Sequence, residues 1–294
     1  MNTKSEQMII WATRASVAVA FSLLILKLYA WFATGSLGIL AALVDSLLDL
    51  GASVINMFAV RYALEPADEE HRFGHGKAEA LAGLGQSLFI ASSAIFLVIY
   101  TVERLLNPQL IASPEVGSWV MLISMALTLI LVTYQRRVVA VTGSIAIKAD
   151  SLHYSADLVT NAGILIGLGL YYFGWLYSDP IIALLIGLYI FKCAAEIGYE
   201  SIQLLLDREL PKEEQERIRE LAAVTEGVIE VHDVRTRQSG QTKFIQLHLV
   251  MDGHLSLFEA HQLSDKVETV LRQSFPNADI IIHQDPHTEV LSTD

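Results

Sequence analysis

The feature that most limits the fold of this chain is a series of six apolar segments in its first 206 residues. A helix crosses the apolar core of a bilayer with about 20 residues. The segments have roughly that length or more, and they are expected at 8–32, 37–63, 78–105, 116–134, 149–173 and 180–206. A segment in lipid must satisfy its own backbone hydrogen bonds. The pattern therefore predicts an α-helical membrane protein with six transmembrane helices.

Composition agrees with a membrane protein that also has a soluble part. Hydrophobic residues make up 53% of the 294 residues, and the mean hydropathy is +0.44. The first segment is too long for the core of a signal peptide and contains Arg14 and Lys27, so we expect it to be retained. The net charge of −12 argues against nucleic acid as a partner. The single cysteine, Cys193, rules out a disulfide framework.

Basic residues in the connections predict the orientation of the chain. Most of them follow the second and fourth apolar segments, as Arg61, Arg72, Lys77, Arg136, Arg137 and Lys148. The connections on the other side contribute only Arg104. The side that carries the basic residues also holds both termini. By the positive-inside rule, we expect the N- and C-termini to be cytoplasmic.

The chain changes character near residue 210, which predicts a transmembrane domain at 1–209 and a cytoplasmic domain at 210–294. Pro211 and the acids after it are typical of the start of a helix. Ser256 with Glu259 predicts a capping box at the start of a second helix. Three strands are expected, at 228–237, 242–252 and 279–283. The order α-β-β-α-β predicts a small ferredoxin-like or metallochaperone-like α+β domain.

Two pairs of polar residues lie inside the apolar segments, and each pair has a spacing of four. Residues four apart lie on one face of a helix. If the two helices face each other, their side chains provide four ligands, enough for a tetrahedral Zn(II) site. The ligands are Asp45, Asp49, His153 and Asp157. Interhelical hydrogen bonding is the alternative, but four potential ligands in matched pairs favour a metal.

Two further groups contain potential metal ligands. In the loop after the second segment these are Asp68, His71 and His75, with Gly74 and Gly76 easing the turn; a solvated charged loop is an equal alternative. In the C-terminal domain they are His232, His248, His261, His283 and Asp285, with Gln284 between the last two.

Other charged residues of the apolar segments are expected to have structural roles. Asp150 is expected to be a solvated charge at a helix end. Lys192 and Glu196, four residues apart, are expected to pair or to extend toward the cytoplasmic side, and Lys27 is expected to extend toward the outer interface. The sequence has no HExxH motif, nucleophile elbow or phosphate-binding loop, which argues against a membrane protease and an ATP-driven pump.

These motifs together resemble the cation diffusion facilitator family, in its zinc/iron branch. The resemblance rests on the sequences DSLLD, HYSAD, DEEHRFGHGK and HQDP and covers nearly the whole chain. It implies a homodimer in the inner membrane of a bacterium. It also implies metal at all three groups, with a two-metal site in the paired cytoplasmic domains at His232, His248, His261, His283, Gln284 and Asp285.

The resemblance further implies a secondary transporter, not an enzyme, that exports divalent metal in exchange for protons. Zn(II) is the expected substrate, with Cd(II) and Fe(II) also accepted, and it is expected in the tail as a structural or regulatory ion; no organic cofactor is expected. Ligands must lose protons to bind metal, and histidine changes its charge near neutral pH. A membrane sensor that binds metal without transporting it is the alternative. The partners expected are a second copy of the chain, the lipid bilayer, metal ions and protons.

Overall fold

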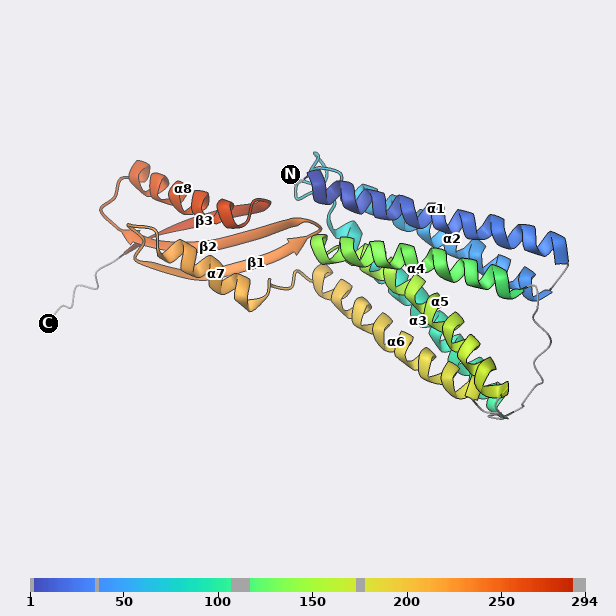
Figure 1. Ribbon diagram of the computed structural model, residues 1–294. Coiled ribbons are helices and arrows are strands. Elements are labelled where there is room, and N and C mark those ends of the chain that lie inside the picture. Colours follow the sequence, from blue (N-terminus) through green and yellow to red (C-terminus); the bar gives the residue numbers. More distant parts are fainter. Residues whose placement is uncertain (1–2, 35–36, 107–116, 173–177, 288–294) are drawn as a thin grey trace. The chain divides into compact units, whose positions relative to one another are not determined.

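The computed structural model describes residues 3–34, 37–106, 117–172 and 178–287 (Figure 1). The chain divides into two compact units, one of Thr3–Ile202 and one of Gln203–Asp294 with the first two residues. The expected connections on the non-cytoplasmic side, at 35–36, 107–116 and 173–177, lie outside the described residues, as does the end of the C-terminal domain at 288–294.

Six long helices form the first unit, and each covers one of the apolar segments of the sequence. They are α1 (Thr3–Thr34), α2 (Leu37–Ala63), α3 (Lys77–Leu106), α4 (Gly117–Thr142), α5 (Ile145–Tyr172) and α6 (Ser178–Leu205). Within the described residues, four stretches are long and apolar enough to cross a membrane: Lys4–Ala33, Lys77–Glu103, Leu122–Thr142 and Ile181–Leu205. The helices α2 and α5, which carry the paired polar residues, are not among these four stretches of the described residues.

The turn between α4 and α5 explains why both helices extend beyond their expected ends. Gly143 has a φ of +65°, a conformation that glycine adopts readily, and its N–H donates to Val139 O. The Ser144 hydroxyl then accepts a hydrogen bond from Ile147 N at 3.3 Å, as an N-cap does. This tight turn lets α5 begin four residues before the expected position.

The helices of the first unit lie side by side as a bundle (Figure 1). The helix α1 packs against α2 and α4, and α5 packs against α3 and α4 and also contacts α2. One core cluster at the end where the α4–α5 turn lies contains Ile9, Val60, Val138 and Ile147, which are at most 1% exposed. This packing brings α2 and α5, which are far apart in the sequence, into contact.

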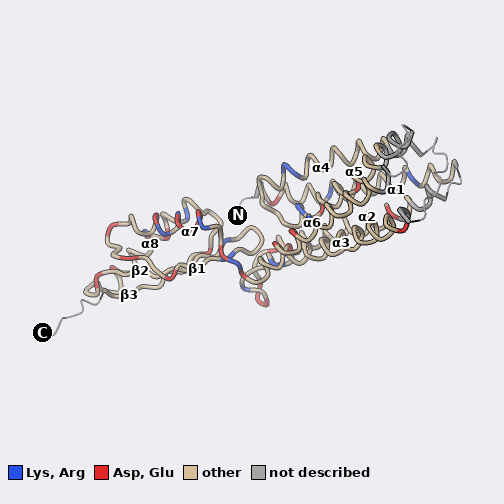
Figure 2. Tube along the Cα trace, turned by 90° about the horizontal axis from the view of Figure 1, so that it is seen from below, with Lys and Arg blue, Asp and Glu red and all other residues tan. Residues whose placement is uncertain are grey.

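The second unit has the expected order of elements: α7 (Lys212–Ala223), β1 (Glu230–Ser239), β2 (Thr242–Asp252), α8 (Leu257–Ser274) and β3 (Ala278–His287). The strand order is β1-β2-β3, with β1 antiparallel and β3 parallel to β2. The capping box is confirmed, because the Ser256 hydroxyl accepts from Glu259 N and the Glu259 carboxylate accepts from Ser256 N. Figure 2 shows charged residues along all elements of this unit, whereas long tracts of α1 to α6 carry none.

One face of the sheet is covered and the other is open. Apolar side chains of β2 at every second position, including Ile245, Leu247 and Leu249, pack with residues of α7 and α8 in a single core and are at most 1% exposed. The other face carries polar residues. The strand β3 continues four residues past its expected end, because it pairs with β2 as far as Asp252 and His287. The segment that contains Asp285 is therefore a strand.

Candidate metal centres

Three of the four ligands expected in the membrane lie close together. Asp49 of α2 and His153 and Asp157 of α5 each offer a ligand atom within 4.8 Å of the other two, and we call them the membrane triad. His153 Nε2 lies 3.0 Å from Asp49 Oδ1. Asp49 is 9% and His153 6% exposed. Asp157 is half-buried, and two carboxylates and an imidazole in such a largely buried group can hold a divalent transition metal.

Neighbouring residues fix the position of α5 against α2. Tyr154, which is 1% exposed, forms a hydrogen bond of 2.8 Å between its hydroxyl and that of Ser53 on α2. Phe89 of α3 packs edge-on against the His153 ring. The imidazole is therefore held between three helices, with its Nε2 directed at α2.

Asp45 lies outside the membrane triad in this conformation. Its side chain is exposed, one turn along α2 from Asp49. Lys27, expected to extend toward the outer interface, forms hydrogen bonds with α2. Lys27 Nζ donates to Ser46 Oγ at 2.6 Å and to Ala42 O at 3.2 Å, beside the acidic pair. The ammonium group places positive charge next to Asp45.

Asp150 is fully buried, so its expected role as a solvated charge at a helix end is wrong. It is 0% exposed and accepts hydrogen bonds from α1, α3 and α4. The early start of α5 causes the difference, because Asp150 lies more than one turn inside the helix instead of at its end. The expected pair of Lys192 and Glu196 is confirmed at 3.7 Å, and both side chains are largely exposed.

The loop between α2 and α3 brings Asp68, His71 and His75 together, and we call these residues the loop group. Asp68 Oδ2 lies 3.3 Å from His75 Nε2, and Asp68 Oδ1 lies 3.6 Å from His71 Nδ1. The two imidazole rings are 4.7 Å apart. His75 is only 6% exposed, and Gly74 has a φ of +77° that turns the chain between the histidines.

Backbone N–H groups stabilise the ionised form of the Asp68 carboxyl, which is the form that binds a cation. The N–H groups of His71 and Glu70 donate to Asp68 Oδ1 at 2.6 and 2.9 Å, which holds the pKa of this carboxyl below its ordinary value. The carboxylate is therefore ionised at neutral pH, and its second oxygen faces His75. The loop group has the geometry of a partly exposed three-ligand site.

Strand register aligns three histidines of the second unit in a row. His232 of β1 lies opposite His248 of β2, and His248 lies opposite His283 of β3. Asp285, two residues after His283, lies on the same face of the sheet. Its carboxylate oxygens lie 2.8 Å from His248 Nδ1 and 3.3 Å from both His232 Nε2 and His283 Nε2. We call these four residues the histidine row.

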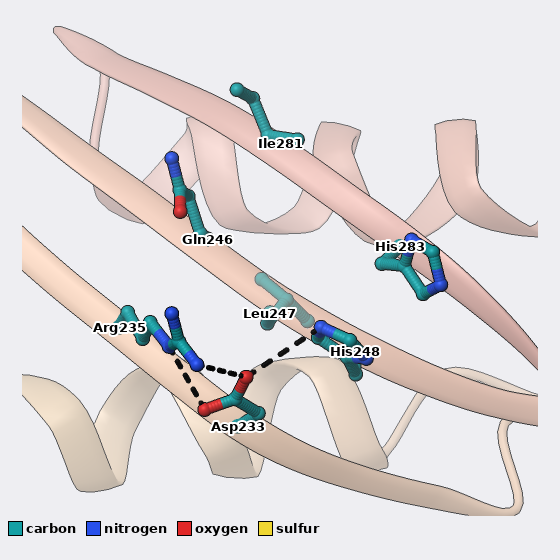
Figure 3. A pocket seen from close by; sticks show the side chains of 7 residues that line it. All are labelled: Asp233, Arg235, Gln246, Leu247, His248, Ile281 and His283. Atoms are coloured by element: carbon teal, nitrogen blue, oxygen red, sulfur yellow. Dashed lines mark hydrogen bonds and ion pairs between the residues drawn. The ribbon is translucent and has the colours of Figure 1, made fainter.

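The histidine row borders a pocket of about 410 Å³ on the open face of the sheet (Figure 3). Asp233 also lines the pocket, and its Oδ2 lies 3.6 Å from His248 Nε2 and 2.9 Å from Arg235 Nη2. The hydrogen bond that Asp285 accepts from His248 holds the pKa of Asp285 below its ordinary value, and the hydrogen bond from Arg235 does the same to the pKa of Asp233.

Two expected ligands of the C-terminal domain do not join the histidine row within one chain. His261 lies on α8 beside Asp265, with its Nε2 3.6 Å from Asp265 Oδ2. Gln284 points to the covered face of the sheet, where its Nε2 donates to Ser264 Oγ at 2.9 Å. The alternation of β3 explains this, since residue 284 faces away from 283 and 285.

Asp233 is a neighbour of the row that the sequence analysis missed. It sits at a register shift between His232 and Arg235 and has a φ of 44°. A bulge of this kind redirects side chains, so Asp233 faces the row although it follows His232 directly. The sequence shows that Asp233 follows a candidate ligand directly. It does not show the bulge that turns Asp233 toward the row.

Comparisons with known proteins agree with the two units. Residues 13–206 match the family model described as the cation efflux transmembrane domain, and residues 210–287 match the cation efflux protein cytoplasmic domain. The cation-efflux pump FieF of Yersinia enterocolitica is 52% identical over 286 residues, which cover 97% of this chain and 95% of that protein. FieF of Pectobacterium atrosepticum is 50% identical over 290 residues, covering 99% and 97%.

A solved structure of CzrB in its zinc form is 40% identical over the aligned part. It covers 28% of this chain and 93% of the CzrB chain, with a TM-score of 0.26. The two family models together span nearly all of the sequence, and the relatives match it from end to end. This chain is therefore a membrane protein of the cation efflux family, also called the cation diffusion facilitator family.

Proposed function

We propose that this protein exports divalent transition-metal ions from the cytoplasm in exchange for protons, with Zn(II) as its main substrate. The observation that carries the proposal is the membrane triad, whose ligand atoms lie within 4.8 Å of one another on two membrane helices. Ionisable groups inside a membrane are costly and usually serve a pathway for ions. The names of the FieF relatives describe pumps for cations, which supports the direction of transport.

The donor set favours zinc. Two carboxylates and one imidazole match the oxygen and nitrogen ligands of tetrahedral Zn(II) sites. Cd(II) and Fe(II) accept similar donors, so we propose them as further substrates. Asp45, one turn from Asp49, would supply the fourth ligand after its exposed side chain turns toward the triad. Three carboxylates and a neutral imidazole would then leave a net charge of −1 around a divalent ion.

Protons compete with metal for the same atoms. An imidazole or a carboxyl must be deprotonated before it binds metal, and His153 Nε2 already faces Asp49 Oδ1 at 3.0 Å. When the site faces the cytoplasm, metal displaces protons. When it faces a more acidic exterior, protons displace metal. Alternating access of this one site, without any further energy source, would couple the two flows.

The same family resemblance supports the remaining parts of the proposal. The chain crosses the inner membrane of a bacterium six times, with both termini in the cytoplasm, and works as a homodimer. The histidine row binds metal in the paired cytoplasmic domains and stabilises the dimer when cytoplasmic metal is high. His261 and Gln284, which lie outside the row, are ligands of a second ion in the paired domains. The boundary between the transport domain and the cytoplasmic domain lies near residue 210.

Proteoliposomes test this proposal. The purified full-length protein is reconstituted with a zinc dye in the lumen, and zinc uptake is recorded with and without a proton gradient that is acidic inside. We expect the gradient to accelerate uptake in the wild type. Asp49→Ala should abolish uptake, while Glu196→Gln, which removes an exposed carboxylate of α6 outside the three groups, should retain it. Uptake that ignores the gradient would contradict antiport, and binding without uptake would indicate a sensor.

A further inference from the structure

A second buried polar cluster lies one helical turn from the membrane triad. It consists of Asp150 on α5, Ser16 on α1, Gln86 on α3 and Gln135 on α4, and we call it the Asp150 cluster. All four side chains are buried: Asp150 and Gln135 are 0% exposed, Ser16 is 1% and Gln86 is 8% exposed. Asp150 precedes His153 by three residues, so the two residues share a face of α5.

The hydrogen bonds of the cluster converge on the Asp150 carboxylate. Asp150 Oδ2 accepts from Ser16 Oγ at 2.5 Å and from Gln135 Nε2 at 2.7 Å. Asp150 Oδ1 accepts from Gln86 Nε2 at 3.2 Å. Gln135 Nε2 also donates to Ser16 Oγ at 2.9 Å. The ionised carboxylate therefore has three donors, each from a different helix.

These donors carry no formal charge. In the part of the chain that the structure describes, Asp150 forms no ion pair with a lysine or an arginine. The groups that face it from α1, α3 and α4 are a hydroxyl and two amides, and the titratable groups near it on α5 are His153 and Tyr154. An ionised carboxylate that is buried without a counter-charge is costly. A proton or another cation would remove this cost.

One atom of the cluster can accept a hydrogen bond from the protonated Asp150 carboxyl. Gln135 Oε1 is buried and has no hydrogen-bond partner among the described residues. A neutral carboxyl donates one hydrogen bond and needs an acceptor. A half-turn of the Gln135 amide about its Cγ–Cδ bond exchanges Nε2 and Oε1, which brings this acceptor to face Asp150. The cluster can thus satisfy both the ionised and the neutral carboxyl.

We infer that Asp150 is a second proton-binding group of the protein, separate from the metal ligands, that releases its proton when a divalent ion occupies the membrane triad. The positive charge of the ion, one turn away in a region of low dielectric, favours the ionised carboxylate. The O–H bond of the neutral carboxyl then breaks, the electron pair stays on Asp150, and the proton passes to water. This inference rests on the proposed exchange of metal for protons.

The test measures protons released per ion bound to the full-length protein in weak buffer with a pH dye. Asp68→Ala and Asp285→Ala are present throughout, to remove the loop group and the histidine row from the measurement. We expect Asp150→Asn to bind zinc at the membrane triad and to release up to about one proton fewer per ion than its parent. Glu196→Gln serves as the matched control and should release as many protons as the parent.

A second variant covers the case in which Asp150→Asn does not fold. Gln86→Leu keeps Asp150 but removes a donor to its ionised form. The pH profile of proton release should therefore shift to higher pH, which loss of helix packing alone would not cause. An unchanged profile in Gln86→Leu, or unchanged proton release in folded Asp150→Asn, overturns the inference. If the parent itself releases no protons on binding zinc, the proposed exchange fails, and this inference fails with it.

Discussion

The membrane triad and the histidine row both combine histidine with aspartate, but they differ in burial and in charge. The side chains of His153 and Asp49 in the triad are 8% and 12% exposed, whereas those of His232 and His283 in the row are 43% and 64% exposed. Ionised, the triad carries two negative charges and the row carries one, from Asp285 alone. The buried group can neutralise a dehydrated divalent ion completely.

This difference in burial and charge indicates two different roles for the same types of ligand. A buried site with two carboxylates replaces the water around an ion and makes protons its natural competitors. An open row of imidazoles would bind an ion that remains partly hydrated, and this ion would exchange freely with the surrounding solution. The first arrangement suits transport across the membrane, and the second suits a response to metal in the cytoplasm.

The largest effect that we predict separates the two groups directly. Asp49→Ala removes the carboxylate that faces His153 and should lower zinc transport on the order of 100-fold or more, since breaking a buried charged pair costs about 3–5 kcal/mol. Zinc binding at the histidine row should stay unchanged. Proteoliposome flux and equilibrium dialysis of the same preparation measure the two. Loss of binding at the row in this variant would contradict their independence.

A substitution in the histidine row should produce the reverse result, with a loss of zinc binding at the row itself. His232→Ala removes one end of the histidine row and should weaken zinc binding there at least about tenfold, since even an outer-sphere partner is typically worth 10–100-fold. Calorimetric titration of full-length protein with Asp49→Ala and Asp68→Ala isolates the row. His254→Ala, an exposed histidine in the turn after β2, is the control and should bind as tightly as the parent. Equal losses in both variants would remove His232 from the site.

A smaller effect on metal binding is predicted for the loop group, from a substitution that strains its backbone. Gly74 has a φ of +77°, and an alanine in the left-handed region costs about 1–2 kcal/mol. Gly74→Ala should therefore weaken metal binding at the loop group roughly tenfold. Gly76→Ala, two residues on, does not require a positive φ and is the matched control. If both variants bind metal equally tightly, in calorimetry on full-length protein without the other two groups, the Gly74 turn does not position the ligands.

The smallest effect concerns pH and the metal-free row. The folded-state pKa of Asp285 lies below its ordinary value of 3.8. The stabilisation that Asp285 provides is therefore present above about pH 3.8 and is lost as the pH falls through the lower folded value. Hydrogen exchange of β3 should be slower in the wild type than in Asp285→Asn at pH 6, and the difference should shrink below pH 4. A difference that persists unchanged in acid would assign it to packing and not to charge.

The sequence predicts features that depend on local spacing better than those that depend on packing. The pairs at 45 and 49 and at 153 and 157 follow from helical period alone, and the capping box at Ser256 follows from adjacent residues. The alignment of His232, His248 and His283 depends on the register among three strands. The sequences of the individual strands do not specify this register.

The burial of Asp150 in the membrane unit likewise depends on packing, which local spacing in the sequence does not predict. Its burial requires that α1, α3 and α4 all meet α5 at one level, with Ser16, Gln86 and Gln135 turned inward. Hydropathy places the residue near a helix end, because it does not detect the turn at Gly143 and Ser144. The exclusion of Asp45 from the membrane triad has a similar origin, since spacing puts it on the right face but not at the right depth.

The central claim is that one ion is held in the membrane part of the protein by a single imidazole together with carboxylates. X-ray absorption at the zinc edge tests it most directly, on full-length protein whose other two groups are removed by Asp68→Ala and Asp285→Ala. The account predicts one bound zinc per chain with one imidazole and otherwise oxygen ligands at about 2.0–2.2 Å, and no bound zinc once His153→Ala and Asp157→Ala are added. Zinc bound through two or more imidazoles, or zinc that survives those substitutions, would contradict the account.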